Sequence, residues 1–320
     1  MLNIRKTLRV LVALSIILLI GFFYSLEVRK NWASLQNFKL IINIYYLIIS
    51  LFFYLLSYLL ETFIWKVCIN KHLGRHELNF FQSIAVVNAS GLFKYLPGRI
   101  WTYTAQLSWL KKYSISKSII LYVNLICILG SLIVSLYLGL IYLALYTNLT
   151  GTKVIVLLAV ALILFNVVYI TWNSLLMNKL IALAGRLLKK EIQPIRDSKS
   201  LIVLIQFIYL FSWGLMGFGG YFLAKGIGLD IPSGSMFAIL ASMSLSWFVG
   251  YFAIISPGGL GIREGTMLLM LNNIVNIQTA LIFPVLSRIM YLVAEALLGL
   301  TALSLGIKYN VFSSTKTSVH

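Results

Sequence analysis

Long apolar runs recur along the whole chain and set its architecture. A helix needs about 20 mostly apolar residues to cross a lipid bilayer. The runs that meet this length are 8–26, 40–65, 118–147, 154–176, 201–228 and 278–307. The pattern predicts an all-α polytopic membrane protein with about six full spans.

Two further apolar stretches, 80–110 and 234–275, are broken near the middle by proline and glycine. Proline removes a backbone donor and clashes with the preceding helical turn, while glycine lets the backbone reverse direction. We therefore predict that each stretch forms a re-entrant helical hairpin. The residues expected to shape the hairpins are Pro97, Gly98, Pro257, Gly258, Gly259 and Gly261.

The two breaks occupy matching places in the two halves of the chain. Long spans surround one broken stretch in each half, and this arrangement is typical of an inverted repeat. We predict a single integral membrane domain over 1–320, with half-repeats at about 1–150 and 151–310. The alternative is that two proline–glycine pairs fall in matching places by chance, since residue identity between the halves is slight.

Composition supports a membrane protein and excludes a soluble one. Hydrophobic residues make up 60% of the chain and charged residues 11%, whereas soluble domains carry about 25% charged residues. The net charge of +18 would suggest nucleic acid in a soluble protein. Here the cations lie mostly in short segments between apolar runs, so we predict membrane lipids with anionic headgroups as partners and no nucleic acid.

The distribution of lysine and arginine predicts the topology. If the two hairpins enter from opposite faces, most cations fall on the side that holds both termini, which the positive-inside rule makes cytoplasmic. The run 8–26 is predicted to be a retained signal anchor, and 177–200 a basic amphipathic helix on the inner leaflet, or else an ordinary loop. Frequent isoleucine and lysine are typical of an AT-rich bacterial genome, so we expect a multi-pass protein of the bacterial inner membrane.

Charged residues accompany both breaks at membrane depth. Lys94 and Arg99 lie beside the first break, and Arg263 and Glu264 follow the second. Free amides at half-helix ends attract anions, so these cations together predict a receptor for a phosphate group. The alternative is that the cations snorkel to an interface or lock the hairpins through salt bridges.

The last apolar run carries a polar stripe. Pro284, Arg288, Tyr291 and Glu295 follow one another at helical spacing, and Arg288 falls about 15 Å into the predicted helix. Arg288 and Glu295 must face protein or water. They pair with each other, or Arg288 binds substrate while Glu295 orients it or carries a proton. Glu61 is expected at an interface instead.

No motif indicates a metal, another cofactor or an enzyme. His72 and His76 have ligand spacing but lie in a basic loop without a further clear ligand. No phosphate-binding loop or nucleophile elbow occurs in the sequence. We therefore expect no cofactor, no metal and no catalytic residues, and we interpret Cys68 and Cys127 as reduced, packed thiols.

The motifs at the two breaks resemble those of a known family. They are the Pro-Gly-Arg at 97–99 and the Pro-Gly-Gly-Leu-Gly-Ile-Arg-Glu at 257–264. The chain resembles, over roughly 80–310, the flippase-like family that includes the transmembrane region of lysylphosphatidylglycerol synthase. Arg288 fits a further arginine of that family.

Two departures from the family pattern concern charged residues. Many members follow the first motif with Gly-Glu, where this chain has Ile-Trp-Thr at 100–102, and many open the next span with Glu-Arg, where it has Leu-Tyr-Val-Asn at 121–124. These departures argue against an identical substrate. The chain ends soon after the last run, so we expect no lysyl-lipid synthesis.

The resemblance implies lipid translocation. The expected function is movement of an anionic phospholipid or polyprenyl-linked glycolipid in cell-envelope biogenesis. The residues expected to bind the lipid phosphate are Lys94, Arg99, Arg263 and Arg288, with Glu264 and Glu295 as charge partners or proton carriers. The main competing hypothesis is a non-catalytic accessory subunit of an envelope-glycan synthesis or export complex. A small-solute transporter and a membrane-embedded transferase are less favoured hypotheses.

Overall fold

The structure is a computed structural model of the chain, and its described part is helical. It describes residues 41–73, 78–95, 101–113, 115–146, 158–171, 198–252, 259–272 and 274–312, with a few isolated residues elsewhere. No strand occurs among these residues. The predicted all-α membrane class is confirmed.

Four described helices are long and apolar enough to cross a membrane. They are α3 (Ile44–Asn70), α6 (Lys117–Tyr146), α8 (Lys199–Gly226) and α11 (Ile277–Lys308). Each follows a predicted run, and α3 continues five residues beyond the predicted end at 65.

The remaining predicted spans are described only in part. The run 154–176 contains the helix Leu158–Thr171. The run 8–26, apart from its last residue, and almost all of the segment 177–200 lie outside the described residues. Cys68 and Cys127 are buried and carry free thiols.

The first broken stretch forms two short helical arms that pack against each other. These are α4 (Phe80–Gly91) with the turn η1 (Leu92–Tyr95), and α5 (Trp101–Trp109) with the turn η2 (Leu110–Tyr113). An Asn79–Gln82 capping box starts α4, which satisfies backbone donors at its first turn. The expected tip residues Pro97 and Gly98 lie outside the described residues.

The second broken stretch also forms a packed helical pair. It comprises η3 (Ser233–Ser235), α9 (Met236–Phe252) and α10 (Ile262–Leu271). Gly259 and Gly261, between the arms, have φ angles of 74° and 81°. Glycine adopts this left-handed region without steric cost, which explains why the chain reverses here. Pro257 and Gly258 lie outside the described residues.

Both arms of the first hairpin reach one face of the bundle. The ring of Phe81 at the start of α4 stacks on Tyr309 after α11, with centroids 6.1 Å apart. The ring of Trp109 at the end of α5 contacts Phe312, at 4.5 Å. The chain therefore enters and leaves on the face where α11 ends, as a re-entrant hairpin does.

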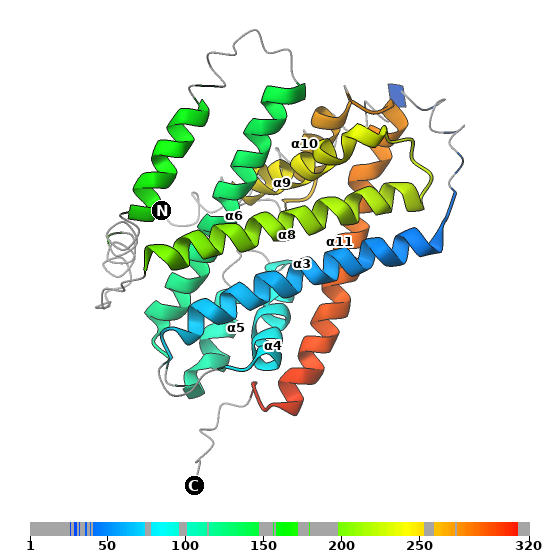
Figure 1. Cartoon of the computed structure of the whole chain (residues 1–320). Coiled ribbons are helices and arrows are strands. Elements are labelled where there is room, and N and C mark those ends of the chain that lie inside the picture. Colours follow the sequence, from blue (N-terminus) through cyan, green and yellow to red (C-terminus); the bar gives the residue numbers. More distant parts are fainter. Residues whose placement is uncertain are drawn as a thin grey trace, which may run out of the picture.

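Both arms of the second hairpin reach the face where α6 ends. The Tyr146 hydroxyl, in the last residue of α6, donates to the carbonyl of Gly234, just before α9, at 3.3 Å. The Tyr142 hydroxyl donates to the carbonyl of Met270, near the end of α10. Figure 1 shows α4 and α5 at the opposite end of the bundle from α9 and α10, so the two hairpins approach from opposite faces.

The two halves pack in matching ways. Each contributes a long helix, a hairpin and a second long helix, namely α3, α4–α5 and α6, then α8, α9–α10 and α11. α3 runs beside α8 (Figure 1), α6 packs on α9, and α11 packs on α4. If α3, α4 and α6 are exchanged with α8, α9 and α11, the same three pairs of helices result. The half-repeats stay a prediction, which this pattern fits.

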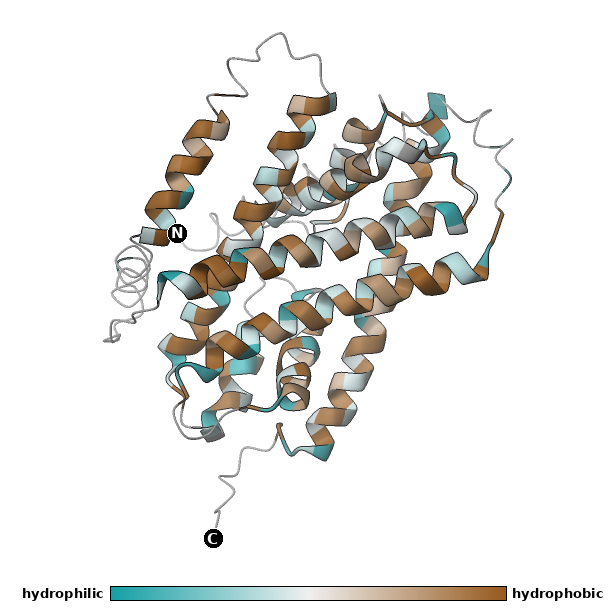
Figure 2. Cartoon of the chain, in the orientation of Figure 1, coloured by the Kyte–Doolittle hydropathy of each residue, from teal (hydrophilic) through white to brown (hydrophobic). Residues whose placement is uncertain are grey.

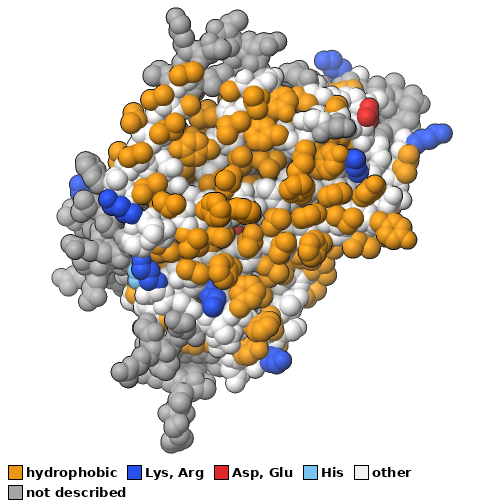
Figure 3. Space-filling view, viewed as in Figure 1, with side chains coloured by type: hydrophobic (Ala, Val, Ile, Leu, Met, Phe, Trp, Pro, Cys, Tyr) orange, Lys and Arg blue, Asp and Glu red, His pale blue; other side chains and the backbone are white. Residues whose placement is uncertain are grey.

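The face formed by α3 and α8 has the composition of a lipid contact. Figure 2 shows long hydrophobic stretches on both helices, and Figure 3 shows hydrophobic side chains across their outer face, with lysine and arginine near its margins. The ring of Phe53 stacks on Phe218 and Phe222, at 5.6 and 5.8 Å. So large an exposed apolar surface requires lipid as its solvent.

Candidate functional site

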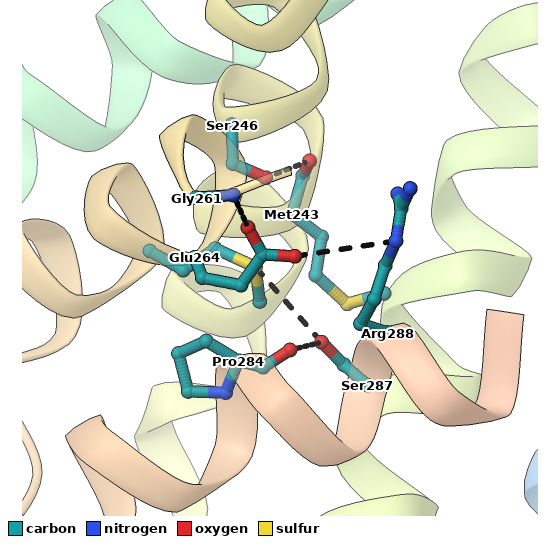
Figure 4. Close-up of polar contacts among 8 residues, drawn as sticks. Met243, Ser246, Gly261, Glu264, Pro284, Ser287 and Arg288 are labelled. Carbon is teal, nitrogen blue, oxygen red and sulfur yellow. Dashed lines mark hydrogen bonds and ion pairs between the residues drawn. The ribbon is translucent and has the colours of Figure 1, made fainter. Parts of the chain in front are cut away.

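The last span brings its polar stripe against the second hairpin. Pro284, Arg288 and Tyr291 of α11 line a cavity of about 20 Å³, and Arg263 and Glu264 of α10 line its other side. A cavity of this size holds about one water molecule. Polar side chains of α10 and α11 point toward one another at this small pocket (Figure 4).

Glu264 connects the hairpin backbone to the last span. One carboxylate oxygen accepts a hydrogen bond from the N–H of Gly261 at 2.7 Å, which caps the first turn of α10. The other lies 4.0 Å from Nε of Arg288 (Figure 4). Both side chains are largely buried, with 13% and 11% exposed. At 4.0 Å this ion pair is longer than a charge-assisted hydrogen bond.

Arg263 lies between two glycines. A Cβ atom on Gly250 would lie 2.6 Å from Cγ of Arg263, and one on Gly259 would lie 2.9 Å from its Nε. Only glycine at both positions leaves room for this arginine. Its Nε is buried, and it has no hydrogen-bond partner among the described residues. A buried, unsatisfied guanidinium donor is costly, and an anion would satisfy it.

Glu295 connects the last span to the first hairpin. Its carboxylate forms an ion pair with Lys94 of η1. It also accepts a hydrogen bond from the Tyr58 hydroxyl of α3 at 2.6 Å. The lysine side chain is 41% exposed and Glu295 only 12%. Three elements distant in sequence therefore meet at one carboxylate.

Tyr291 joins the two ion pairs into one cluster. It lies between Arg288 and Glu295 on α11, and its ring makes edge contacts with Tyr54 and Tyr58 at 5.0 and 6.3 Å. Its hydroxyl interacts electrostatically with Arg263, Glu61, Glu295 and Arg288. Charges from both hairpins, α3 and α11 thus form one connected group.

Comparison with known proteins assigns the family. Residues 7–299 match the family described as the lysylphosphatidylglycerol synthase TM region. The chain belongs to this family. Among curated proteins, none matches it. Membership identifies a multi-pass membrane protein and indicates a role in lipid or envelope biogenesis.

The structure brings together those family residues that it describes. Arg263 and Glu264 from the second motif meet Arg288 of the last span, and Lys94 meets Glu295. Arg288 and Glu295 therefore each take a partner from a hairpin. Arg99 of the first motif lies outside the described residues. Phosphate binding by these cations stays a prediction.

Hydrogen bonds between neutral side chains hold the first hairpin. The Gln106 amide in α5 donates to Ser90 of α4 at 2.9 Å, and Asn124 of α6 donates to Gln106 at 2.7 Å. Asn88 of α4 donates to Thr62 of α3 at 3.1 Å. Sequence reasoning missed this network, although amides within apolar helices are a signal for such bonds.

Sequence reasoning also misplaced Glu61. It was expected at an interface, yet α3 continues to Asn70 and places Glu61 well inside the helix. The hydroxyl of Ser212 in α8 donates to its carboxylate at 3.1 Å. The signal was available, because buried apolar residues such as Ile64 and Cys68 continue the helix beyond Glu61.

Proposed function

We propose that the chain is a non-enzymatic translocase for the headgroup of an anionic phospholipid or a polyprenyl-linked glycolipid. Lys94, Arg99, Arg263 and Arg288 hold the phosphate in turn or together. One observation carries the proposal: cations from both re-entrant hairpins and from the last span belong to one connected group of charges. A cluster shared by opposed hairpins is the arrangement that a carrier of anions needs.

The chemistry of the cations suits phosphate. Guanidinium groups bind phosphate oxygens with paired, charge-assisted hydrogen bonds, and a buried Arg263 Nε lacks such a partner among the described residues. Glu264 and Glu295 act as stand-in anions that hold Arg288 and Lys94 when no phosphate is bound. A phosphate then exchanges with a carboxylate, so no bare cation is left at membrane depth.

The positions of the two hairpins suit a mechanism of alternating access. The pocket between α10 and α11 has room for about one water molecule, and in the proposed mechanism a hairpin moves away from α11 to admit the phosphate group. The first hairpin reaches one face of the bundle and the second reaches the other. Movement of either hairpin would open the cluster to a different side of the membrane.

Lipid transport by the reconstituted protein tests the proposal. We expect Arg263→Gln to slow the crossing of a fluorescent anionic phospholipid in liposomes by roughly tenfold or more, since a hydrogen bond to a charged group contributes about 1.5–3 kcal/mol. Lys225→Gln is the matched control, because Lys225 is exposed near the end of α8 and lies over the ring of Tyr221, at 4.9 Å. Equal rates for Arg263→Gln and the wild type would overturn the assignment.

An accessory role in an envelope-glycan complex is the second candidate. The ion pairs Lys94–Glu295 and Arg288–Glu264 satisfy charges within the protein, as a purely structural role would require. Native mass spectrometry of the protein released from its membrane distinguishes the two. An anionic lipid that disappears in Arg263→Gln supports the translocase. A partner protein in both samples, with no lipid in either, supports the accessory role.

A further inference from the structure

Glu61 is a carboxylate at membrane depth that the proposed transport site does not use. It lies about 25 Å from the start of α3 and about 14 Å from its end. Because the hydrocarbon core of a bilayer is about 30 Å thick, neither distance lets the side chain reach bulk water easily. A carboxylate in this position needs a partner or a proton.

The contacts of Glu61 supply hydrogen bonding but no cation. Its hydrogen bond comes from the Ser212 hydroxyl at 3.1 Å. That hydroxyl also lies 2.7 Å from the hydroxyl of Ser57, and both serines are buried. Within the described ranges, no lysine, arginine or histidine lies within 4.0 Å of the Glu61 carboxylate. Glu295, by contrast, has both Lys94 and the Tyr58 hydroxyl.

The elements packed around α3 bring one cation toward Glu61. The titratable groups that interact electrostatically with it in the described part of the chain are Lys94 of η1, Glu295 and Tyr291 of α11, Tyr58 of α3, Cys127 of α6 and Tyr209 of α8. Among these, Lys94 alone carries positive charge, and Glu295 holds it. Glu61 therefore shares its one cation with Glu295, which also interacts electrostatically with Arg263.

Such an arrangement gives the two carboxylates different protonation states. Two like charges in one low-dielectric site repel, so the carboxylate without the cation takes up a proton while its neighbour stays ionised. We propose that Glu61 is a proton-binding site of this protein, with the proton on a carboxyl oxygen hydrogen-bonded to Ser212. The proton comes from water and returns to it.

The consequence for transport rests on the proposed function. A phosphate that takes Lys94 would face a second negative charge if Glu61 were ionised, whereas a protonated Glu61 is neutral. Proton uptake at Glu61 therefore favours phosphate binding, and the anion and the proton bind together. This makes Glu61 the residue that couples lipid movement to a proton gradient.

Infrared spectroscopy of the lipid-free purified protein tests the proton site directly. The carbonyl stretch of a protonated carboxyl group is separate from carboxylate bands. We expect the wild type to show this band at neutral pH and lose it as the pH is raised. Glu61→Gln should remove the band, and Ser212→Ala should shift its frequency while keeping its intensity, because the proton remains and its hydrogen bond is lost. Glu264→Gln is the matched control and should retain the band.

Two outcomes would overturn the proton site. One is a carboxyl band that persists in Glu61→Gln. The other is a Glu61 signal that responds to sodium ions at constant pH and not to pH, which would make the residue a sodium ligand. Because this measurement uses no lipid, its result does not depend on the transport proposal.

Lipid binding as a function of pH tests the coupling. With phosphatidylglycerol in nanodiscs, we expect wild-type affinity to fall about tenfold as Glu61 loses its proton, while Glu61→Gln binds equally at each pH. The same pH dependence in both proteins would overturn the coupling. Absence of binding to either at every pH would overturn the proposed function and leave the proton site intact.

Discussion

The two re-entrant hairpins each consist of two packed helices but are held by different forces. In the first, hydrogen bonds between neutral side chains fix the arms, with Gln106 joining Ser90 to Asn124. In the second, close packing fixes them, because Gly250 and Gly259 leave room for Arg263 and nothing larger. Two helical hairpins in one chain are thus held together in two different ways.

The difference teaches where each hairpin tolerates change. Interhelical hydrogen bonds in a membrane contribute about 0.6–2 kcal/mol each, and a neighbouring group can often replace a lost partner. A steric clash in a packed core costs about 1–3 kcal/mol and also moves the side chain that it displaces. The second hairpin should therefore be the more sensitive of the two, above all at its glycines.

The largest effect is expected at Gly250. Gly250→Ala would place a methyl group against Cγ of Arg263, destabilise the protein by about 1–3 kcal/mol and abolish lipid transport. Thermal unfolding in detergent and transport in liposomes would measure both. Adding Arg263→Ala should restore stability but not transport, since it removes the clash together with the phosphate ligand.

A matched glycine provides the control for this variant. A Cβ on Gly214, inside α8, meets no atom within 4 Å. Gly214→Ala should leave transport unchanged and raise stability by up to about 1 kcal/mol, because alanine loses less backbone entropy in a helix. Equal loss of stability in Gly250→Ala and Gly214→Ala would show that packing at the second hairpin is not special.

A smaller effect is expected at the first hairpin. Gln106→Leu removes the hydrogen bonds that join Gln106 to Ser90 and Asn124 and should cost about 1–2 kcal/mol. The double variant Gln106→Leu/Asn124→Leu should cost less than the sum of the single changes, because both members of one hydrogen bond are removed together. Chemical denaturation of the three variants measures this. Strict additivity would mean that the bond does not hold the hairpin.

The smallest effect is expected for the ion pair between Lys94 and Glu295. The lysine is about two-fifths exposed, so solvent screens the pair. A double-mutant cycle with Lys94→Met and Glu295→Gln should give a coupling energy of about 1 kcal/mol. Stability measured for the four proteins completes the cycle. A coupling near zero would mean that this ion pair adds nothing to the packing of α4 on α11.

Local patterns predicted the helices well. The run 118–147 corresponds to Lys117–Tyr146 and the run 278–307 to Ile277–Lys308, because crossing a bilayer depends on the length of an apolar segment and little else. The breaks at proline and glycine were equally local, since the covalent structure of these residues decides where a helix ends.

The contacts between distant residues were harder to predict, because the tertiary fold determines which side chains meet. Lys94 and Glu295 are 201 residues apart, and no spacing rule connects them. Gly250 carried no signal, since its significance comes from the arginine that the hairpin folds against it. Glu61 was misplaced because a charge near the end of an apolar run usually marks an interface, whereas here the helix continues past it.

The position of Arg288 and Glu295 on one rigid helix has a genetic consequence. They lie two turns apart, about 10 Å, and each holds a hairpin that enters from a different face. A lesion in one hairpin therefore shifts the helix that the other hairpin rests on. Second-site suppressors of a defect at Lys94 are expected beside Glu264, far away in the sequence and in the opposite hairpin, so the two halves of the gene must evolve together.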